Sequence, residues 1–408
     1  MMDGDPGQTD WAIPEHVPAE LVRDVDFYHL PGADTDVHLA WRQVQQENPD
    51  IFWTPRNGGH WMITRADLIE VLQMDHERFS MAALSLPRVA GANAMQAIPI
   101  SLDPPRHWPY RKLMQPAFLP RAVDKLEAGV RETAIRLIEG FAADGHCEFV
   151  GAFATRLPIT VFMDMMDLPA EDMDRLRPLA DIATRSADVA ERRKASGAMA
   201  AYVMTYVRER RDSPGEDLIS FIGKGEVEGR PITFEETLSM VVLLMFGGLD
   251  TVASMLGFVA RFLAEHPDHR RQLTDDPALI PNAVEELIRR HGLVNTARLV
   301  VEDTELKGVR FKKGDQVQVP NGLAGLDERR FDDPLTVDFN RERPIKHAAF
   351  GGAPHTCPGA ILARRELKVF LEEWLPRIPD FSIAPGEKPE YAVGMVNTVT
   401  SLPLVWPV

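Results

Sequence analysis

Residues Phe350–Gly359 have the sequence FGGAPHTCPG, and they decide how the rest of the chain is interpreted, because they place one cysteine between a glycine-bearing loop and a helical segment. The segment that follows, AILARRELKVFLEEWL at 360–375, repeats its apolar residues at helical spacing. A loop that enters a helix N-terminus offers fixed amide donors and a favourable dipole, which stabilise a thiolate. We therefore interpret Cys357 as a metal-ligating thiolate. The alternative is an inert buried cysteine, the commoner role of an unpaired cysteine.

Composition limits the classes of partner and the compartment. The net charge of −16, from 61 acidic against 45 basic residues, opposes nucleic acid and anionic membranes as general partners. With only two cysteines, Cys147 and Cys357, the chain suits a reducing cytoplasm and has no disulfide framework. The first 17 residues lack the basic and apolar regions of a secretory signal, and the longest apolar run, Met240–Leu249, is shorter than the ~18 residues of a membrane span. We expect a cytoplasmic protein without a nucleic-acid or membrane partner.

Apolar periodicity predicts a mainly helical protein with a few short strands. No linker, low-complexity tract or repeat divides the 408 residues, so 1–408 is expected to form a single domain. The predicted helices are Val37–Gln46, Ala66–Met74, Ala122–Ala143, Glu171–Thr184, Glu191–Arg211, Phe234–Glu265, Ala278–Arg290 and Ala360–Leu375. The predicted strands are Ile51–Trp53, His60–Thr64, Arg298–Val301, Val309–Phe311 and Gln316–Val319, with an extended end at Asn397–Trp406.

The long helix predicted at 234–265 carries a second unusual stretch. It opens with a capping box, Thr233-x-x-Glu236. At its centre, Gly247-Gly248-Leu249-Asp250-Thr251 puts two helix-weakening glycines directly before an acid and a hydroxyl. Taken alone, this stretch predicts a tolerated kink. Beside a cofactor loop, it also fits a helix that brings its backbone close to a bound group and carries a hydroxyl and a carboxylate for proton transfer.

A third stretch, Glu286-Leu287-Ile288-Arg289, places an acid and a base at i, i+3 on one helix. By itself this is an ordinary surface pair that contributes tenths of a kcal/mol.

The three stretches together resemble the signatures of the cytochrome P450 family: F-G-x-G-x-H/R-x-C-x-G around Cys357, A/G-G-x-D/E-T at the long helix, and E-x-x-R at Glu286 and Arg289. One position departs from the first signature, since Ala353 stands where the pattern has its second glycine. If that position needs a positive φ, alanine is strained there. Over nearly the whole chain, order and spacing are similar to the bacterial camphor-hydroxylating members of the family. The resemblance implies the mainly α P450 fold with small β-sheets beside a helical core, and a haem b.

The resemblance also implies roles for individual residues. Cys357 would be the thiolate ligand of the haem iron, Asp250 and Thr251 would deliver protons during oxygen activation, and Glu286 and Arg289 would support the cysteine loop. Haem carboxylates need cationic or hydrogen-bonding partners, and the matched positions are Arg111, Arg298 and His355, assisted by His107.

Alignment to the camphor-hydroxylating enzymes selects the substrate pocket. Its residues are Leu86, Met95, Ala97, Leu243, Leu244, Phe246, Gly247, Val294, Thr296, Met395 and Val396. Residues of these types are more often plain core, so only the alignment singles them out. The set is almost wholly apolar, which favours a compact substrate recognised by shape, such as a terpenoid or norisoprenoid. Met95 stands where a tyrosine would bind the camphor ketone, which makes camphor a doubtful substrate.

The resemblance further implies electrons that reach the haem from NADH through a reductase and a [2Fe–2S] ferredoxin, with O2 as oxidant. The expected ferredoxin face is on the cysteine side and contains Arg106, His107, Arg111, Lys112, Arg364, Arg365 and Lys368. The alternative for these residues is ordinary surface charge. Three other functions remain open: a haem-based sensor or carrier, a peroxide-driven haem enzyme, and a zinc site that uses His347, His355, Cys357 and Cys147, which lacks compact ligand spacing.

Overall fold

The computed structural model describes residues 12–89 and 96–408. Its helices are α1 (Val37–Glu47), α2 (Ala66–Met74), α3 (His107–Met114), α4 (Pro120–Glu139), α5 (Arg156–Met166), α6 (Met173–Arg185), α7 (Val189–Asp212), α8 (Leu218–Gly223), α9 (Phe234–Glu265), α10 (Pro267–Asp275), α11 (Ile280–Arg290), α12 (Leu323–Leu326) and α13 (Ala360–Arg377). Helices make up most of the structure, as the apolar periodicity predicts.

The strands are short and form small sheets. They are β1 (Ile51–Thr54), β2 (His60–Ile63), β3 (Phe79–Ser80), β4 (His146–Glu148), β5 (Glu226–Val227), β6 (Arg230–Pro231), β7 (Asn295–Val300), β8 (Thr304–Leu306), β9 (Val309–Phe311), β10 (Gln316–Pro320), β11 (Ser382–Ile383), β12 (Glu390–Ala392), β13 (Thr398–Ser401) and β14 (Pro403–Val405). The largest sheet has the order β1-β2-β10-β7-β3, in which only β2 and β10 pair in parallel. A three-stranded sheet joins β11, β14 and β4.

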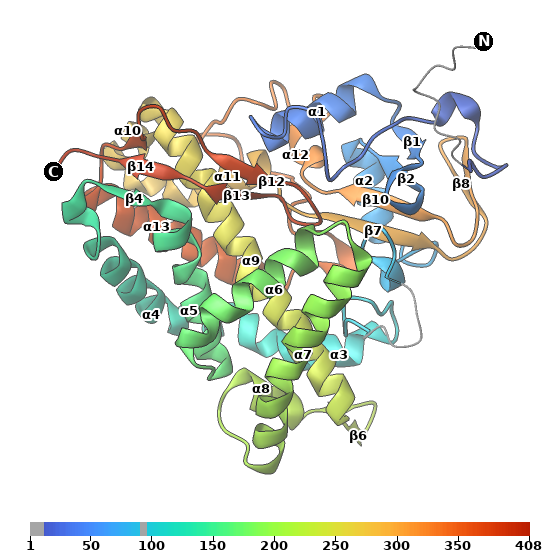
Figure 1. Ribbon diagram of the computed structural model, residues 1–408, viewed down its shortest axis with the longest axis horizontal. Coiled ribbons are helices and arrows are strands. Elements are labelled where there is room, and N and C mark those ends of the chain that lie inside the picture. The colour runs from blue at the N-terminus through green and yellow to red at the C-terminus, as the bar shows by residue number, and fades with distance from the viewer. Residues whose placement is uncertain (1–11, 90–95) are drawn as a thin grey trace, which may run out of the picture.

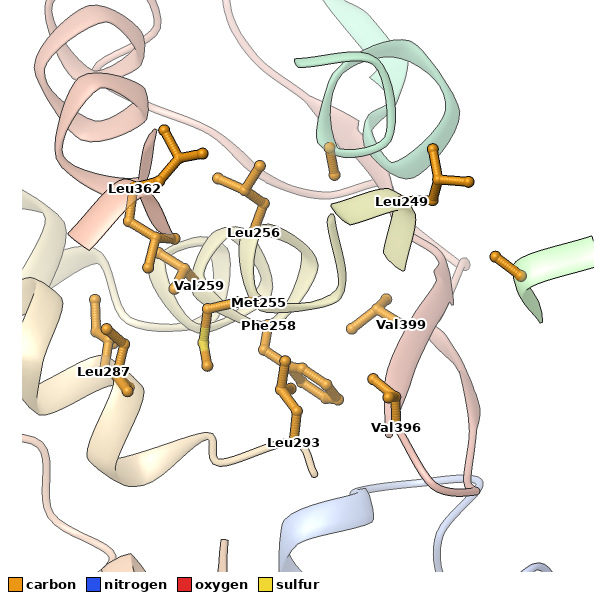
Figure 2. Packing of buried hydrophobic residues seen from close by; sticks show 14 of the residues in the cluster. Leu249, Met255, Leu256, Phe258, Val259, Leu287, Leu293, Leu362, Val396 and Val399 are labelled. Atoms are coloured by element: carbon orange, nitrogen blue, oxygen red, sulfur yellow. The ribbon is translucent and has the colours of Figure 1, made fainter. Parts of the chain in front are cut away.

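Helix α9 is the centre of the helical part of the molecule. Figure 1 shows it in yellow, passing between the helices α5, α6 and α7 and the elements of the C-terminal third. Its buried side chains meet α11 through Leu287, α13 through Leu362, and β13 through Val399 (Figure 2). By length and composition α9 could cross a membrane, but 61% of its most apolar window is buried inside the protein, which is typical of a core helix.

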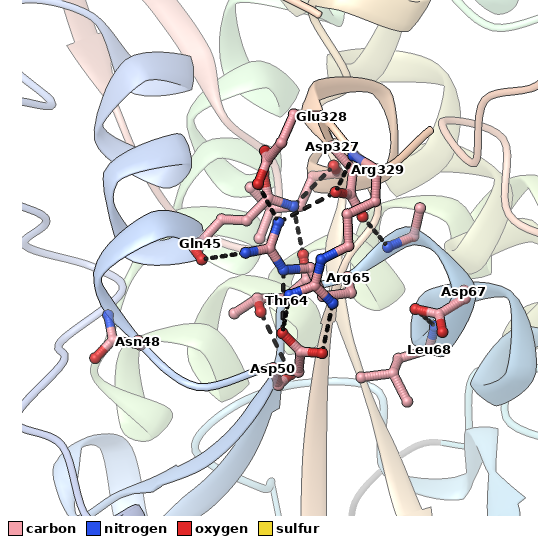
Figure 3. Close-up of polar contacts among 12 residues, drawn as sticks. Gln45, Asn48, Asp50, Thr64, Arg65, Asp67, Leu68, Asp327, Glu328 and Arg329 are labelled. Carbon is pink, nitrogen blue, oxygen red and sulfur yellow. Dashed lines mark hydrogen bonds and ion pairs between the residues drawn. The ribbon is translucent and has the colours of Figure 1, made fainter. Parts of the chain in front are cut away.

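A polar cluster fixes the β-rich part to the segment that leads toward the cysteine loop (Figure 3). Arg65, just before α2, pairs with Asp50 at 3.2 Å, with Asp327 at 3.1 Å and with Glu328 at 2.8 Å. The carboxylate of Asp327 also accepts the amide hydrogen of Ala66 at 2.8 Å. Residue 65 has no cap of its own for α2, so a residue more than 250 positions away supplies one of the hydrogen bonds that a helix N-terminus needs.

The bounds of α2, α9 and β9 are as predicted, and α9 begins with the capping box of Thr233 and Glu236. The other predicted helices are present with shifted ends, whereas α3, α5, α8, α10 and α12 were not predicted. Helix α9 also continues without interruption through Gly247 and Gly248, so these two glycines do not end the helix.

Candidate active site

A cavity of about 310 Å³ lies between α9 and the segment that carries Cys357. Its wall comes from α3, α5, α9, α11, α13 and the cysteine segment, and most of the lining side chains are apolar. Of the predicted site residues, His107, Arg111, Leu243, Leu244, Gly247, Thr251, Val294, His355 and Cys357 line it. Residues more than 200 positions apart in sequence therefore surround one enclosed space.

The loop around Cys357 is held by its own backbone and by the start of α13. The amide of Cys357 donates to the carbonyl of Phe350 at 2.8 Å, which closes the loop. The accessible surface of the thiol faces the enclosed cavity, and the amides of Gly359 and Ala360 donate toward the sulfur. Burial raises the pKa of the thiol. The two amides, by hydrogen bonding, and the positive charges of Arg111 and Arg364 lower it. This environment has the donors that a metal-bound thiolate requires.

The departure at Ala353 is visible in the backbone. Gly351 has a φ of 70°, which glycine adopts without cost, but Ala353 has a φ of 49°. An L-residue in this left-handed region is strained by roughly 1–2 kcal/mol, because its Cβ approaches the following carbonyl. The loop keeps the path for which the family pattern uses glycine, and stores this strain two residues before His355.

A polar cluster on the cavity wall has more donors than acceptors. The rings of His107 and His355 meet edge to face with centroids 4.7 Å apart, and neither ring has a hydrogen-bond partner among the described residues. Asp103 approaches His355 at 3.6 Å, too far for a hydrogen bond. Burial lowers the pKa of His107 to about 4.

The two arginines expected at this cluster differ in their contacts. Arg298 is buried next to this cluster, and among the described residues it donates only to Thr296 and Ala297. Burial lowers the pKa of Arg298 to about 10. Arg111 lines the cavity and donates to the carbonyl of Thr356 at 2.6 Å. A buried cation without a counter-ion lowers the stability of the folded protein, and so does a buried imidazole without a hydrogen-bond partner. An anion bound among such groups removes this loss of stability. The donor set therefore fits the carboxylates of the haem that the sequence resemblance implies.

The two central glycines of α9 have different surroundings. A Cβ at Gly247 would meet nothing within 4 Å, and Gly247 lines the cavity. A Cβ at Gly248 would lie 2.5 Å from the ring of Phe162 on α5. Gly248 is therefore needed for the close packing of two helices, and Gly247 leaves open space above the cysteine segment.

Asp250 and Thr251 are neighbours in sequence, but their side chains lie on different faces of α9. Thr251 lines the cavity, and its hydroxyl donates to the carbonyl of Gly247 at 2.9 Å. The buried carboxylate of Asp250 accepts from Arg185 of α6 at 2.5 Å, and from Thr184 and Ser254 at 3.3 and 3.4 Å. No hydrogen bond joins Asp250 to Thr251 in the described part of the chain, because successive helical side chains point about 100° apart.

Glu286 and Arg289 are fully buried, so their interpretation as a surface pair is wrong. Arg289 donates to both carboxylate oxygens of Glu286, at 2.8 and 2.7 Å, and to the carbonyls of Gly325, Pro334 and Thr336. Arg341 adds a third contact to Glu286 at 2.9 Å. The pair ties α11 to the chain before the cysteine segment, and each charge is fully hydrogen-bonded, as buried charges require.

The remaining pocket residues stay a prediction, because they do not line this cavity. Leu86, Ala97, Phe246, Thr296, Met395 and Val396 do not form the wall of this cavity, and Met95 lies outside the described residues. Sequence reasoning missed Phe162, Met255, Asn321 and Glu366, which do line it. Glu366 is 1% exposed, and it has no ion pair or hydrogen bond to any described residue. Burial raises its pKa to about 8.

The expected basic face is only partly free of acidic partners. Arg364 pairs with Glu285, Arg365 with Asp124 and Glu127, and Lys368 with Glu372. His107 is fully buried and cannot belong to a surface. Within residues 12–89 and 96–408, the exposed Arg106 and Lys112 have no acidic partner.

The zinc alternative is contradicted by the positions of its residues. Among the described residues, no group of three or more His, Cys, Asp or Glu side chains is placed to hold a metal ion. Cys147 lies buried in β4, and burial raises the pKa of its thiol to about 12.

Comparison with known proteins places this cavity in a family. The cytochrome P450 family model matches residues 183–392. A Sinorhizobium fredii protein named "Probable cytochrome P450 127A1" is 36% identical over 97% of this chain and 97% of its own length. The mycinamicin IV hydroxylase/epoxidase of Micromonospora griseorubida is 34% identical, over 91% of this chain and 97% of its own. The nocardicin C N-oxygenase of Nocardia uniformis is 32% identical, over 91% and 96%.

Two solved structures share the fold over almost the whole chain. CYP101J2 superposes with a TM-score of 0.89 and CYP101C1 with 0.88; each is 40% identical, and each match covers 97% of this chain and 100% of the other. The overall fold thus agrees with that of these neighbours. The chain belongs to the cytochrome P450 family, binds haem b and is a monooxygenase.

Proposed function

We propose that this enzyme hydroxylates a small apolar substrate, with terpenoids and norisoprenoids as the best-fitting class, and that its electrons come from NADH through a ferredoxin reductase and a [2Fe–2S] ferredoxin. The observation that carries the substrate class is the mostly apolar lining on the α9 side of the cavity, where Leu243, Leu244, Gly247 and Val294 lie. The CYP101 neighbours support the ferredoxin. The relatives named hydroxylase/epoxidase and N-oxygenase have unrelated substrates in their names, so the substrate class rests on the cavity.

Five residues are proposed to hold the haem. Cys357 is the iron ligand, and Arg111, Arg298, His107 and His355 bind the haem carboxylates. Among the described residues, the rings of His107 and His355 have no hydrogen-bond partner, and the guanidinium groups of Arg111 and Arg298 donate only to uncharged oxygens. When bound, the haem supplies the binding and reductive activation of O2. Glu286 and Arg289 keep the chain before the cysteine segment in place through buried hydrogen bonds.

Proton delivery is proposed to use Thr251 and Asp250 in sequence. The hydroxyl of Thr251 faces the cavity, where it can donate a proton after leaving the carbonyl of Gly247. The carboxylate of Asp250 is held by Arg185, so it must separate from that guanidinium before it can pass a proton toward the cavity. The contact between Asp250 and Arg185 joins α9 to α6, which makes proton supply dependent on the position of α6.

The substrate is proposed to be positioned by shape. Leu243, Leu244 and Val294 offer apolar contact, and the side-chain oxygen of Asn321, which also lines the cavity, already accepts from Gln73 at 2.9 Å. In such a site, the burial of apolar substrate surface stabilises the complex by roughly 25 cal/mol per Å². We also propose that the chain forms one domain, since the core is continuous from the helices to the sheet. We further propose that it acts in the cytoplasm.

A binding screen tests the substrate class. Monoterpenes and norisoprenoids, with polar isosteres of equal size as controls, are added to the ferric enzyme while the haem absorption is followed. Loss of the axial water on addition of the apolar compounds supports the proposal. A response to the polar isosteres alone contradicts it.

Turnover distinguishes the proposed reaction from the two other haem functions. A product formed from NADH, reductase, ferredoxin and O2 supports the monooxygenase. A product formed only with added peroxide favours the peroxide-driven enzyme, and binding without any product favours a sensor or carrier.

A further inference from the structure

A buried cation without a counter-ion lies at the end of α11, outside the haem cavity. Arg290, the last residue of this helix, is 8% exposed and forms no ion pair within residues 12–89 and 96–408. Its Nε donates to the carbonyl of Leu335 at 3.3 Å, whereas its buried Nη1 has no acceptor among the same residues. Burial lowers the pKa of Arg290 to about 10, so the guanidinium is still charged at neutral pH. A buried charge without a partner lowers the stability of the folded protein.

Two neighbours of Arg290 also have unused hydrogen-bond donors. Arg261 of α9 donates from Nη2 to Asp36 at 2.7 Å and from Nε to Glu265 at 3.0 Å, but its buried Nη1 has no acceptor in the described part of the chain. His291 is 3% exposed, and neither of its ring nitrogens has a partner there, although one of them carries a hydrogen in the neutral ring. Burial lowers the pKa of His291 well below its ordinary value, and the positive charges of Arg290 and Arg261 act in the same direction, so the three groups lie close together.

The packing around these groups is largely aromatic. The ring of His291 stacks on Phe258 of α9 at a centroid distance of 5.9 Å and meets the ring of His38 of α1 at 5.0 Å. The Nε2 of His38 donates to the carbonyl of Gly292 at 3.2 Å, so the other ring nitrogen of neutral His38 is an acceptor and adds no donor. Leu293, two residues after His291, lines the haem cavity, but the two arginines and His291 do not. The cluster is therefore separate from the active site.

Hydrogen bonding and charge balance make different demands on the partner of this cluster. A water molecule can accept hydrogen bonds from the unused donors, but it leaves the charge of Arg290 uncompensated. An anion meets both demands, because it accepts charge-assisted hydrogen bonds and balances the cation. One negative charge is sufficient, since Arg261 already pairs with Asp36 and Glu265. Because Arg290 and His291 are more than nine-tenths buried, the anion must also be small.

We propose that a chloride ion binds between α9 and the end of α11, where it accepts hydrogen bonds from Nη1 of Arg290, Nη1 of Arg261 and one ring nitrogen of His291. The ion compensates Arg290 and joins the two helices, and it takes no part in the reaction. Sulfate and phosphate are too large for the closed packing and carry more charge than one cation balances. The site does not depend on the proposed substrate or electron donor, so it stands or falls separately from them.

Chloride bound only by the folded protein stabilises that state by mass action. Well above the Kd, each tenfold increase in chloride raises the folding equilibrium constant about tenfold. Arg290→Met keeps a long side chain but removes the charge, so the variant no longer needs an anion. Without chloride, Arg290→Met should be at least as stable as the wild type. At high chloride, the wild type should be the more stable of the two.

Urea unfolding of the holoenzymes at a fixed neutral pH, with chloride exchanged for gluconate at constant ionic strength, measures this change. The general effect of each salt cancels, because only the difference between wild type and variant is used. Arg270→Met is the matched control. Arg270 is 4% exposed, but it pairs with Asp380 and donates to the carbonyls of Leu263, Pro379 and Phe381. Its loss should therefore destabilise the protein to the same extent in both salts.

Crystals of the wild-type holoenzyme grown with bromide give a second readout that needs no variant. An anomalous bromine peak in hydrogen-bond contact with Nη1 of both Arg290 and Arg261 supports the site, and no peak at this place refutes it. If the stability difference between the wild type and Arg290→Met is the same in chloride and gluconate, the proposal is also wrong. Water then satisfies the donors, and a bromide peak would reflect binding at crystal concentration only.

Discussion

Glu366 allows a quantitative prediction, because its carboxyl is buried and has no ion pair or hydrogen bond within residues 12–89 and 96–408. The residue lies on α13 and lines the cavity, and burial alone raises its pKa to about 8 from an ordinary 4.5. The folded protein therefore keeps this proton at neutral pH, whereas the unfolded chain releases it. Folding becomes less favourable as pH rises between these two pKa values, because there the folded state binds more protons than the unfolded state.

The size of the effect follows from the interval between the two pKa values. Each pH unit contributes about 1.4 kcal/mol, so the free energy of unfolding is lowered by roughly 3 kcal/mol at pH 7 and by at most about 5 kcal/mol above pH 8. Glu366→Gln keeps the shape of the neutral acid and has no proton to lose. The variant should match the wild type near pH 4.5 and become progressively more stable than it up to about pH 8.

Guanidinium unfolding of both holoenzymes between about pH 5 and pH 9 measures this difference. Glu372→Gln is the control on the same helix. Glu372 pairs with Lys368 and Arg131, and its pKa is lowered, so its contribution is complete above the ordinary pKa and its removal should give a constant difference over this range. Infrared absorption of a protonated carboxyl at pH 7, lost in Glu366→Gln, gives an independent readout. Parallel stability curves for Glu366→Gln and the wild type would refute the reasoning.

Three further predictions concern the site. Thr251→Ala should leave substrate binding and haem reduction nearly intact while it diverts electrons to peroxide, with Thr251→Ser as the hydroxyl-bearing control; an unchanged product yield per NADH consumed contradicts the assignment. Ala353→Gly should raise the free energy of unfolding by up to about 1 kcal/mol, because φ is 49° there, whereas Ala349→Gly, at an ordinary φ, should lower it; denaturant titration compares the two. Pro358→Leu restores an amide hydrogen next to those of Gly359 and Ala360 and should raise the haem reduction potential when the substrate state is held constant; an unchanged or lowered potential leaves Pro358 as a helix-start residue only.

The sequence predicted best those elements whose apolar residues repeat at one clear spacing. Helix α2 and helix α9 have apolar residues at helical spacing and recognisable starts. Helix α5 was missed because a short, mostly buried apolar run does not by itself distinguish a helix from a buried strand. Helix α3 was missed because Pro109 and mixed side chains fill its eight residues. Apart from β9 and the extended C-terminal end, the strands of two or three residues were missed, because they are too short to show alternation.

In the site, too, the residues that belong to sequence motifs were predicted, and those that only packing brings to the cavity were not. Cys357, His355 and Thr251 lie in sequence motifs, and the structure places all three in the cavity wall. Phe162 and Glu366 could not be predicted, since only the packing of α5 and α13 against α9 brings them there. The uncompensated cations could not be predicted either, because which of the basic residues meets an acid is decided by contacts between distant helices.

The unequal surroundings of the two glycines in α9 matter for anyone who wishes to redesign this enzyme. A library that varies position 248 would push α5 away from α9, because the ring of Phe162 already occupies the space of a side chain. Position 247 has no such obstacle, and alanine there favours the helix by roughly 1 kcal/mol over glycine. A single methyl group at position 247 therefore makes the reaction chamber smaller without a cost in folding. Selectivity for smaller molecules can be sought at this position first.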